Sequence, residues 1–408
     1  MKTISTEQFA ALLADLPDNP RIVCSGNFAT PRTLVEILDR TLPTYTLSML
    51  NAQRGIPDRE GVTLETTFVG PGMRNSPRLR YVPCRLSLVP VLFRDVMRPD
   101  LVLLHTSTLR YDTVSLGIEV NVLPAAIEAA REHGVPVVAQ LNSQMPYTYG
   151  DAQIYDSEID YAVEVDEALT AHVPGDPGQI AADIGGRIAH LVENGSTLQL
   201  GIGGIPDAVL TRLMDRRGLR IWTEMFSDGV LALHRRGALD DEIPLTASFL
   251  FGSQELYDFV HVNKRVRMLR TETTNNPGLI ARQPKMTSIN GALQVDLFDQ
   301  ANASRMHGRI YSGFGGSVDF IEGAIHSRGG ASYMALPSWH AKANVSTIVP
   351  RIEEPVTSFQ HSAVVTEQGV ARVFGLDERE QAISLIENAA HPNARDSLRE
   401  AGSKMGLL

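Results

Sequence analysis

Short apolar runs alternate along the chain with segments of helical periodicity. The strand-like runs lie at 21–26, 100–107, 135–142, 196–202 and 219–224. Between the second and third runs, the Ala-rich segment 123–134 has helical spacing and ends at Gly134, a residue type that commonly terminates helices. A strand, a helix and a second strand in this order form a βαβ unit. The repeated alternation therefore predicts an α/β fold built on open parallel sheets.

A break in this pattern near the middle of the chain predicts two domains. The chain has 408 residues, a length that suits two domains better than one. Residues 172–178, HVPGDPG, contain two prolines and two glycines and interrupt both periodicities, and a helical pattern follows at 178–195. We therefore predict domains at 1–174 and 175–408. Further helices are predicted at 363–373, at 378–385 and in the last stretch, 393–408.

Composition narrows the class of protein. Hydrophobic residues make up 43% of the chain and charged residues 21%, as in an ordinary globular enzyme. The formal net charge of -10 argues against nucleic acid as a partner, because nucleic-acid binders carry a basic surface. It does not exclude an anionic small molecule, which a few local cations and backbone N–H groups can hold.

Cysteine use and the start of the chain indicate the compartment. Cys24 and Cys84 have no CxxC spacing, which fits a reducing environment without disulfides or a zinc site. The apolar residues of the segment 1–17 have helical spacing, and the segment contains the acidic Glu7. A secretory signal has instead a basic region followed by an unbroken apolar stretch. No stretch approaches the about 18 apolar residues of a membrane-spanning helix. We expect a soluble, cytoplasmic protein that does not contact membranes.

A glycine-rich turn is the sharpest local feature. The strand-like run at 196–202 leads into Gly201, Gly203 and Gly204, then Pro206 at an expected first helical position. Glycines let a ligand approach the backbone, and the N–H groups at the start of the helix favour a phosphate or an oxyanion. A tightly packed βα turn without a ligand is an equally ordinary interpretation. A dinucleotide-binding loop is disfavoured because its third glycine is replaced by Pro206.

Glu224 stands at the end of the next strand-like run, in the segment IWTEMFSDG. Open α/β sheets place ligand crevices at the carboxyl ends of their strands. A carboxylate beside Trp222, Met225 and Phe226 is expected to be partly desolvated and therefore a stronger nucleophile if it stays ionised. The competing interpretation is a strand-end glutamate in a salt bridge or helix cap.

Three further features bear on the chemistry. A second glycine cluster, 313–316, precedes a helical pattern and can admit a ligand or simply form a tight crossing. Lys342 lies in a predicted loop, where an ammonium can reach a phosphate, although most such lysines are merely solvated. The histidines show no metal-binding spacing, and no GxSxG motif marks an esterase serine.

Six ordered segments resemble the acetyl-CoA hydrolase/transferase family of class I CoA-transferases, near its 4-hydroxybutyrate CoA-transferase branch. They are LQLGIGGIPDAV (198–209), WTEMFSDG (222–229), SINGALQVDL (288–297), SGFGGSVDFIEGA (312–324), PSWHAKANVSTIVP (337–350) and TSFQHSAVVTEQGVARVFGL (357–376). The resemblance continues into the first half through 141–151 and 157–167. It implies two open parallel-sheet α/β domains of the CoA-transferase type, the first shaping the acyl pocket.

The same motif matching implies the site residues. The family nucleophile falls on Glu224, in the second domain. The implied coenzyme A contacts are Gly201, Ile202, Gly203, Gly204, Ile205, Asn290, Gly316 and Lys342. The family lysine aligns with Ala341 without a gap, one place before Lys342. Gln294 stands where relatives often carry an acid, and the loop 104–117 lacks the usual spacing, so an unusual substrate is expected.

The resemblance implies transfer of coenzyme A between small acids such as acetate, butyrate and 4-hydroxybutyrate. The expected route is ping-pong, through an acyl-glutamyl anhydride and a glutamyl-CoA thioester. Coenzyme A is then a substrate, and neither a prosthetic group nor a metal is expected. Acyl-CoA hydrolysis on the same scaffold is the first alternative, because water can open either intermediate. A coenzyme A-binding protein without turnover is the second. A homodimer is the expected assembly, since it is the commonest closed one.

Overall fold

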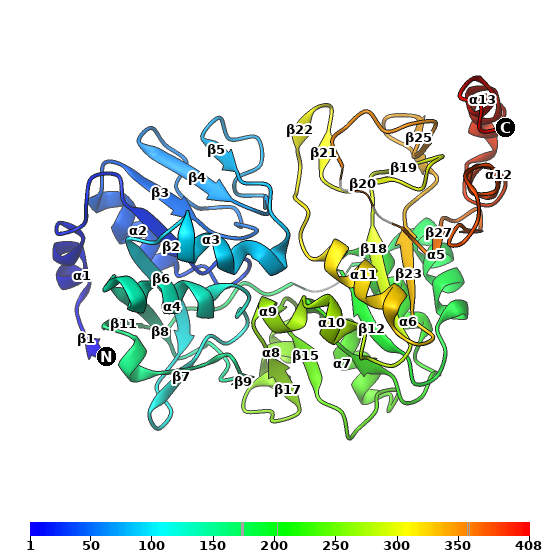
Figure 1. Ribbon diagram of the computed structural model, residues 1–408. Coiled ribbons are helices and arrows are strands. Elements are labelled where there is room, and N and C mark those ends of the chain that lie inside the picture. Colours follow the sequence, from blue (N-terminus) through cyan, green and yellow to red (C-terminus); the bar gives the residue numbers. More distant parts are fainter. Residues whose placement is uncertain (173–174, 202, 357, 359) are drawn as a thin grey trace. The chain divides into compact units, whose positions relative to one another are not determined.

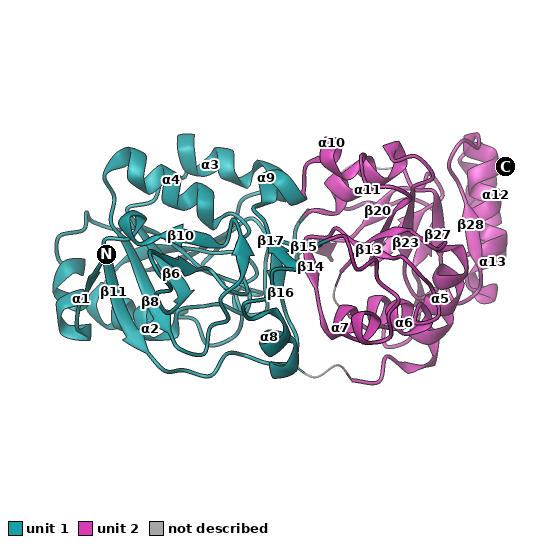
Figure 2. Cartoon of the chain, turned by 90° about the horizontal axis from the view of Figure 1, so that it is seen from below, with its two compact units in different colours: residues 1–172, 244–274, 310–315 teal, residues 173–243, 275–309, 316–408 magenta. Residues whose placement is uncertain are grey.

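The structure is a computed structural model that describes residues 1–172, 175–201, 203–356, 358 and 360–408. Two compact units make up the chain (Figures 1 and 2). Unit 1 comprises residues 1–172, 244–274 and 310–315, and unit 2 comprises residues 173–243, 275–309 and 316–408. The predicted domains, 1–174 and 175–408, are each continuous in sequence, whereas these compact units are not.

Unit 1 is built on one long sheet in which every neighbouring pair of strands is parallel. In spatial order its strands are β1 (Lys2–Thr3), β11 (Tyr161–Val165), β8 (Val137–Asn142), β6 (Leu101–Ser107), β2 (Arg21–Cys24), β3 (Tyr45–Ser48), β4 (Val62–Thr66) and β5 (Leu79–Tyr81). The order reverses direction between β2 and β6, as in doubly wound folds. All seven residues of β6 are buried, as expected for a central parallel strand.

The ends of the helices of unit 1 follow the local sequence. These helices are α1 (Thr6–Leu13), α2 (Arg32–Thr41), η1 (Leu86–Leu88), α3 (Val89–Asp95), α4 (Leu123–His133), η2 (Asp156–Glu158), α8 (Gln254–Val260) and α9 (Thr271–Thr274). Ser5 and Gln8 form a capping box at the start of α1. Gly134 ends α4 in the left-handed conformation, with φ 67°, as the sequence predicts. The core between helices and sheet includes Phe9 and Tyr45, both fully buried.

Small strands complete unit 1. They are β7 (Thr113–Ser115) with β10 (Gln153–Tyr155), the set β9 (Tyr149–Gly150), β15 (Leu245–Ala247) and β17 (Val266–Met268), and β16 (Phe249–Leu250). Strand β17, which comes from 244–274, pairs with β9 from the first 172 residues, and β15 pairs with the other edge of β17. This backbone pairing joins the returning segment to unit 1.

Unit 2 has a second sheet, parallel except at its last strand. In spatial order its strands are β13 (Arg220–Ile221), β12 (Thr197–Leu200), β18 (Met286–Gly291), β23 (Ala331–Ala335), β27 (Ala363–Val365) and β28 (Val370–Arg372). The helices are α5 (Gly178–Leu191), α6 (Gly204–Arg212), α7 (Asp228–Arg235), α10 (Pro277–Ile280), α11 (Ser317–His326), α12 (Glu378–Asn388) and α13 (Pro392–Lys404). Short strands are β14 (Met225–Phe226), β19 (Gln294–Asp296), β20 (Ala301–Asn302), β21 (Arg305–Met306), β22 (Arg309–Ile310), β24 (Trp339–His340), β25 (Val345–Ser346) and β26 (Ile348–Val349).

These sheets confirm the predicted α/β class, but one predicted helix is wrong. Residues 363–373 form the antiparallel hairpin β27–β28, not a helix. Val364 and Val365 are fully buried in it, and Gly369 lies in the turn. A short apolar run cannot be assigned from periodicity alone, and the β-branched residues favoured a strand. The predicted helix from residue 378 is confirmed as α12, which lies against β28.

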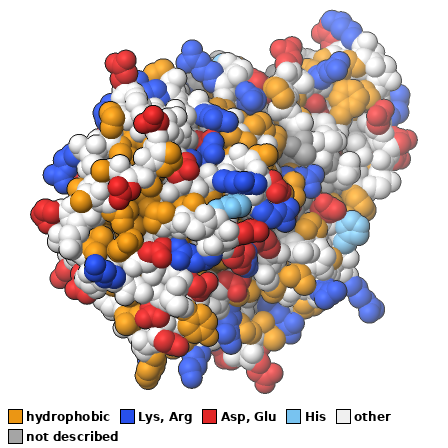
Figure 3. All heavy atoms as spheres, turned by 60° about the vertical axis from the view of Figure 1, so that its left-hand side comes forward, with side chains coloured by type: hydrophobic (Ala, Val, Ile, Leu, Met, Phe, Trp, Pro, Cys, Tyr) orange, Lys and Arg blue, Asp and Glu red, His pale blue; other side chains and the backbone are white. Residues whose placement is uncertain are grey.

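Charged side chains of both signs are interspersed over the face shown in Figure 3. Within the part of the chain that the structure describes, no helix is both long and apolar enough to cross a membrane.

Candidate active site

The carboxyl ends of three neighbouring strands of unit 2 carry the predicted site. Strand β12 lies between β13 and β18, and all three are parallel, so they end at the same edge of the sheet. Gly201 directly follows β12, Glu224 follows β13, and Asn290 is the penultimate residue of β18. Ligand crevices of open parallel sheets lie at this edge. The sheet thus gathers segments that are far apart in sequence.

Glu224 lies in a bend between β13 and β14, because the strand expected over 219–224 is regular only at Arg220–Ile221. The Thr223 hydroxyl lies 3.2 Å from the carbonyl oxygen of Leu200. Trp222 packs instead on an apolar cluster that includes Phe320. The bend therefore holds Glu224 next to the end of β12 while its neighbour Trp222 anchors the segment in the core.

Asn275 is the hydrogen-bond partner of Glu224. Its Nδ2 atom donates to Oε2 of Glu224 at 2.9 Å, and its side chain is fully buried. The next residue, Asn276, acts differently, because its side chain accepts from the backbone N–H of Leu279 and caps α10. Sequence reasoning missed Asn275. The segment TTNNPG signals a helix start, but that signal does not distinguish the capping asparagine from the buried one.

Gly316 fits directly against the Glu224 carboxylate. A Cβ atom built on Gly316 would lie 1.9 Å from Oε2 of Glu224 and 2.1 Å from Nδ2 of Asn275, so a larger residue does not fit. Gly316 is also the N-cap of α11, a helix of ten residues. The amides and dipole at this end of a helix favour negative charge. Gly316, predicted as a coenzyme A contact, is therefore placed at the nucleophile itself.

The electrostatic setting keeps Glu224 poised near neutrality. Burial raises the pKa of Glu224 to about 7, against the opposing effect of the Asn275 hydrogen bond. The charge of Asp319, a buried residue in the first turn of α11, adds to the increase. A carboxyl group with this pKa is ionised in a large fraction of molecules at pH 7 to 8 and is more basic than an exposed glutamate. Asp319 is a second residue that the sequence did not identify.

The glycine loop after β12 is open on its ligand side. Nothing lies within 4 Å of a Cβ built on Gly201 or Gly203, and both residues are exposed. Gly203 has φ 125°, which only glycine adopts readily, and it is the N-cap of α6 without any side-chain cap. The helix begins at Gly204, so Pro206 is its third residue. The prediction that Pro206 is the first helical residue is therefore wrong. Ile202 lies outside the described residues.

Two further predicted coenzyme A contacts, Ile205 and Asn290, lie on α6 and β18. Ile205 is part-buried in the first turn of α6. The Nδ2 atom of Asn290 donates to Oγ of Ser288 at 2.8 Å. The Nε2 atom of Gln199 donates to Oδ1 of Asn290 at 3.3 Å. Asn290 is thus held at the strand edge by side chains of β12 and β18. Its contact with coenzyme A stays a prediction.

Lys342 lies in the exposed turn of the hairpin β24–β25. It makes no hydrogen bond or ion pair with another described residue, so its ammonium group is available to solvent or a ligand. No described contact joins it to Glu224, and its role too stays a prediction. Across the described ranges, no group of three or more His, Cys, Asp or Glu side chains is arranged to hold a metal ion.

Comparisons with known proteins give a consistent result. The model of the acetyl-CoA hydrolase/transferase N-terminal domain matches residues 63–174, and that of the C-terminal domain matches residues 252–402. A 4-hydroxybutyrate coenzyme A transferase from Clostridium kluyveri is 36% identical over 95% of this chain and 94% of its own length. An acetyl-CoA hydrolase from Kluyveromyces lactis is 32% identical over 69% of this chain and 58% of its own length.

Solved structures show the same likeness. RipA from Yersinia pestis has a TM-score of 0.92 and 29% identity, with 100% of this chain and 98% of that chain covered. A 4-hydroxybutyrate CoA-transferase from Porphyromonas gingivalis has a TM-score of 0.83 and 33% identity, with 99% of this chain and 98% of that chain covered. The similarity therefore extends over both compact units.

Proposed function

The chain belongs to the acetyl-CoA hydrolase/transferase family of CoA-transferases, and on that premise we propose that it passes coenzyme A between small carboxylic acids through a covalent intermediate on Glu224. One observation carries the assignment of the nucleophile. A carboxylate with a pKa of about 7 lies at the start of α11, hydrogen-bonded to Asn275 and against Gly316. Such perturbed groups cluster at catalytic sites.

The reaction proceeds by two exchanges at carbonyl groups. The Glu224 carboxylate attacks the thioester carbonyl of the donor, the C–S bond breaks, and coenzyme A leaves as the thiolate, producing an acyl-glutamyl anhydride. The thiolate then attacks the glutamyl carbonyl and expels the first acid as its carboxylate. The product is a glutamyl-CoA thioester. The acceptor acid opens it by the same steps in reverse, which returns Glu224 as a free carboxylate.

The glycine loop and the start of α11 supply the groups that these steps need. Backbone N–H groups of residues 203–205 and of the first turn of α11 stabilise developing oxyanions without reorganisation. We assign coenzyme A contacts to the described members of the predicted set: Gly201, Gly203, Gly204, Ile205, Asn290, Gly316 and Lys342. The acids are small, in line with relatives named for 4-hydroxybutyrate, acetate and butyrate.

Hydrolysis of acyl-CoA is the second candidate, favoured by the acetyl-CoA hydrolase among the relatives. Both reactions share the first intermediate, and they differ in whether water or an acid opens it. Release of coenzyme A from acetyl-CoA without any added acid measures hydrolysis. A rate that rises at least tenfold on adding a small acid, with a new acyl-CoA as product, indicates transfer.

Intact-protein mass spectrometry tests the covalent step. The protein is incubated with acetyl-CoA and treated with borohydride, which reduces a glutamyl thioester to an alcohol. We expect the mass change to map to the peptide that contains Glu224. Glu224→Gln should abolish it, whereas Glu193→Gln, which removes an exposed glutamate paired with Lys285, should not. An unmodified Glu224 peptide during steady transfer of coenzyme A to an acid would refute the covalent route.

A further inference from the structure

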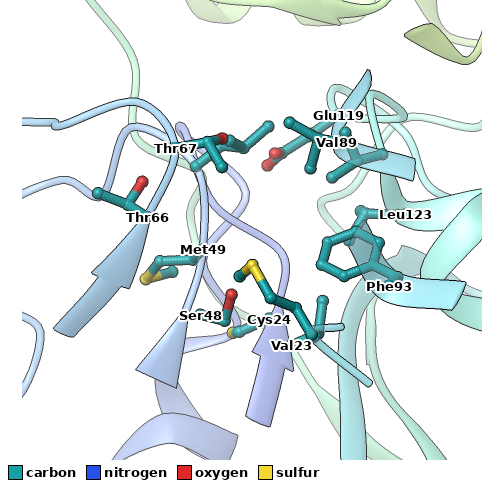
Figure 4. A pocket seen from close by; sticks show the side chains of 13 residues that line it. Val23, Cys24, Ser48, Met49, Thr66, Thr67, Val89, Phe93, Glu119 and Leu123 are labelled. Carbon is teal, nitrogen blue, oxygen red and sulfur yellow. The ribbon is translucent and has the colours of Figure 1, made fainter. Parts of the chain in front are cut away.

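Two hollows of the described structure differ greatly in size. The cavity in unit 1 is lined by the ends of β2, β3 and β4 and by residues of α3 and α4, among them Cys24, Phe93 and Leu123 (Figure 4). Its open volume is about 20 Å³, which is room for about one water molecule. A groove on unit 2 has an open volume of about 810 Å³, within the range of sites that bind small molecules. Of the two, the groove is the one that can hold a whole ligand.

The groove on unit 2 follows one face of α5 and reaches the end of α6. Titratable side chains line it from α5, from the last residue of α6 and from the turn after α6. Those on α5 are spaced four and three residues apart, so they lie on the same side of the helix. A polar wall therefore runs along the groove. Its titratable residues are Asp183, Arg187, His190, Arg212, Asp215 and Arg216.

The three arginines of the groove have no carboxylate partner among the described residues. Nη2 of Arg187 donates to the carbonyl oxygen of Glu367 at 2.9 Å. Nη2 of Arg216 donates to the carbonyl oxygen of Ala189 at 3.0 Å. Arg212 is exposed and makes no hydrogen bond or ion pair with another described residue. Because arginine stays charged in proteins, three cations without an ionic partner line one groove of a chain whose net charge is -10.

The negative groups of the groove offset these cations only in part. The carboxylate of Asp215 lies 3.8 Å from the guanidinium group of Arg236, an arginine outside the groove. Asp183 accepts from Nε2 of Gln179 at 2.7 Å. The carbonyl groups at the end of α5 add partial negative charge, and Arg216 already bonds one of them. With Arg236 counted, four arginines stand against two aspartates, so the groove favours an anion.

A nucleotide matches the chemistry and the size of this groove. Guanidinium groups bind phosphate oxygens through paired hydrogen bonds and stack on flat rings. A carboxylate such as that of Asp183 can accept from a ribose hydroxyl or from the amino group of a base. Ala182, Leu191 and Val370 add apolar surface to the lining. A bare inorganic anion would use the arginines but leave most of the groove empty.

The groove lies away from the candidate nucleophile within unit 2. Its α5 residues come before β12, and the turn that holds Asp215 comes before β13, whereas Glu224 follows β13 at the other end of the strands. Gly204 and Arg212 are the first and last residues of α6. They are about 12 Å apart at a rise of about 1.5 Å per residue. The groove therefore meets the end of α6 that points away from the glycine loop.

We propose that this groove is a nucleotide-binding site, in which Arg187, Arg212 and Arg216 bind the phosphates of a nucleoside di- or triphosphate. The site is additional to the substrate site at Glu224, and it does not depend on the proposed transfer reaction. Arg212 carries the clearest contribution, because no described residue occupies its guanidinium group.

Isothermal titration calorimetry on the full-length protein tests the site. ADP, ATP, tripolyphosphate and adenosine are titrated separately, with EDTA present to exclude metal ions. We expect one ADP or ATP to bind per chain, more tightly than tripolyphosphate or adenosine, and binding to weaken between about 0.1 M and about 0.5 M salt. Binding of tripolyphosphate as tight as that of ATP would refute recognition of a nucleotide. If none of the four binds, the groove is not a ligand site.

Matched arginine variants locate the binding. Arg212→Ala should raise Kd for ADP about tenfold, as expected for the loss of one charged hydrogen-bond donor at a phosphate. Arg212 is exposed, so the variant should keep the Tm of the wild type. Arg379→Ala removes an exposed arginine of α12 that does not line the groove, and it should leave Kd unchanged. Equal Kd values for the two variants would place any nucleotide elsewhere.

Coenzyme A separates this site from the substrate site, because it contains an ADP moiety of its own. The ADP titration is therefore repeated on protein saturated with coenzyme A. We expect one ADP still to bind, with an unchanged Kd that Arg212→Ala raises as before. Loss of ADP binding in the presence of coenzyme A would make the groove part of the substrate site and overturn the inference.

Discussion

The Nδ2 atom of Asn275 lies 2.9 Å from Oε2 of Glu224, although the two residues are 51 positions apart in the chain. This hydrogen bond opposes the effect of burial on the Glu224 carboxyl group. It therefore helps to set the pH at which the nucleophile is ionised.

Replacing Asn275 with Leu should shift the pH dependence of the reaction. Without the donor the pKa of Glu224 rises further above about 7, because hydrogen bonds to the charged form lower it. The acidic limb of kcat/KM against pH should move upward by about one to two pH units, since a hydrogen bond to a charged group contributes roughly 1.5–3 kcal/mol. Activity should fall most below pH 7 and recover partly near pH 9.

The neighbouring Asn276→Ala is the matched control for that experiment. It removes the cap of α10 and should lower the free energy of unfolding by about 1 kcal/mol. Its pH profile should match that of the wild type. A profile for Asn275→Leu that also matches the wild type would show that the hydrogen bond does not tune Glu224.

Gly316→Ala should abolish most of the activity without unfolding the protein. The added methyl group would lie 1.9 Å from Oε2 of Glu224, so the carboxylate must move from its place. A displacement of this size at a reacting group costs about 100-fold in kcat. The comparison is Gly186→Ala in α5, where nothing lies within 4 Å of the new atom and φ is not positive, so activity should persist. Full activity in Gly316→Ala would place the nucleophile elsewhere.

Glu224→Gln should stabilise the protein at alkaline pH and not at acidic pH. The pKa of Glu224 is raised from 4.5 to about 7, so between these values the folded state holds a proton that the unfolded state releases. The free energy of unfolding therefore falls as pH rises through this window, and glutamine removes that loss. We expect Tm of the variant to exceed that of the wild type at pH 8 and the difference to vanish near pH 5. Calorimetry at both pH values measures it, and a difference independent of pH would contradict the raised pKa.

Lys342→Ala should raise KM for acetyl-CoA several-fold while changing kcat little. The exposed ammonium group has no partner within the described chain, so its contribution would come from a phosphate of the substrate. The effect should weaken with added salt, as exposed charge interactions do. Lys404→Ala makes the same change in charge on α13, where Lys404 pairs with Glu400, and should leave KM unchanged. Equal values of KM for both variants would remove Lys342 from the site.

Sequence patterns were reliable where the physical signal is local. Gly134 ends α4 and the apolar runs became β2, β6, β8 and β12, because helix stops and buried parallel strands depend on a few consecutive residues. The hairpin at 363–373 was not predicted, because its formation depends on pairing with strands outside the local run. Its valines favour a strand, but the apolar run is too short for periodicity to decide, and pairing with β23 and between β27 and β28 fixes the strand.

The sequence by itself determined the α/β class, the family and the position of Glu224 as the candidate nucleophile, since ordered motifs survive without knowledge of contacts. Only the tertiary structure decided what surrounds that carboxylate. Asn275 and the start of α11, which includes Gly316 and Asp319, approach it from two separate segments. Parallel strands bring distant loops to one edge of a sheet, and side-chain proximity there is fixed by strand order, which no local pattern records.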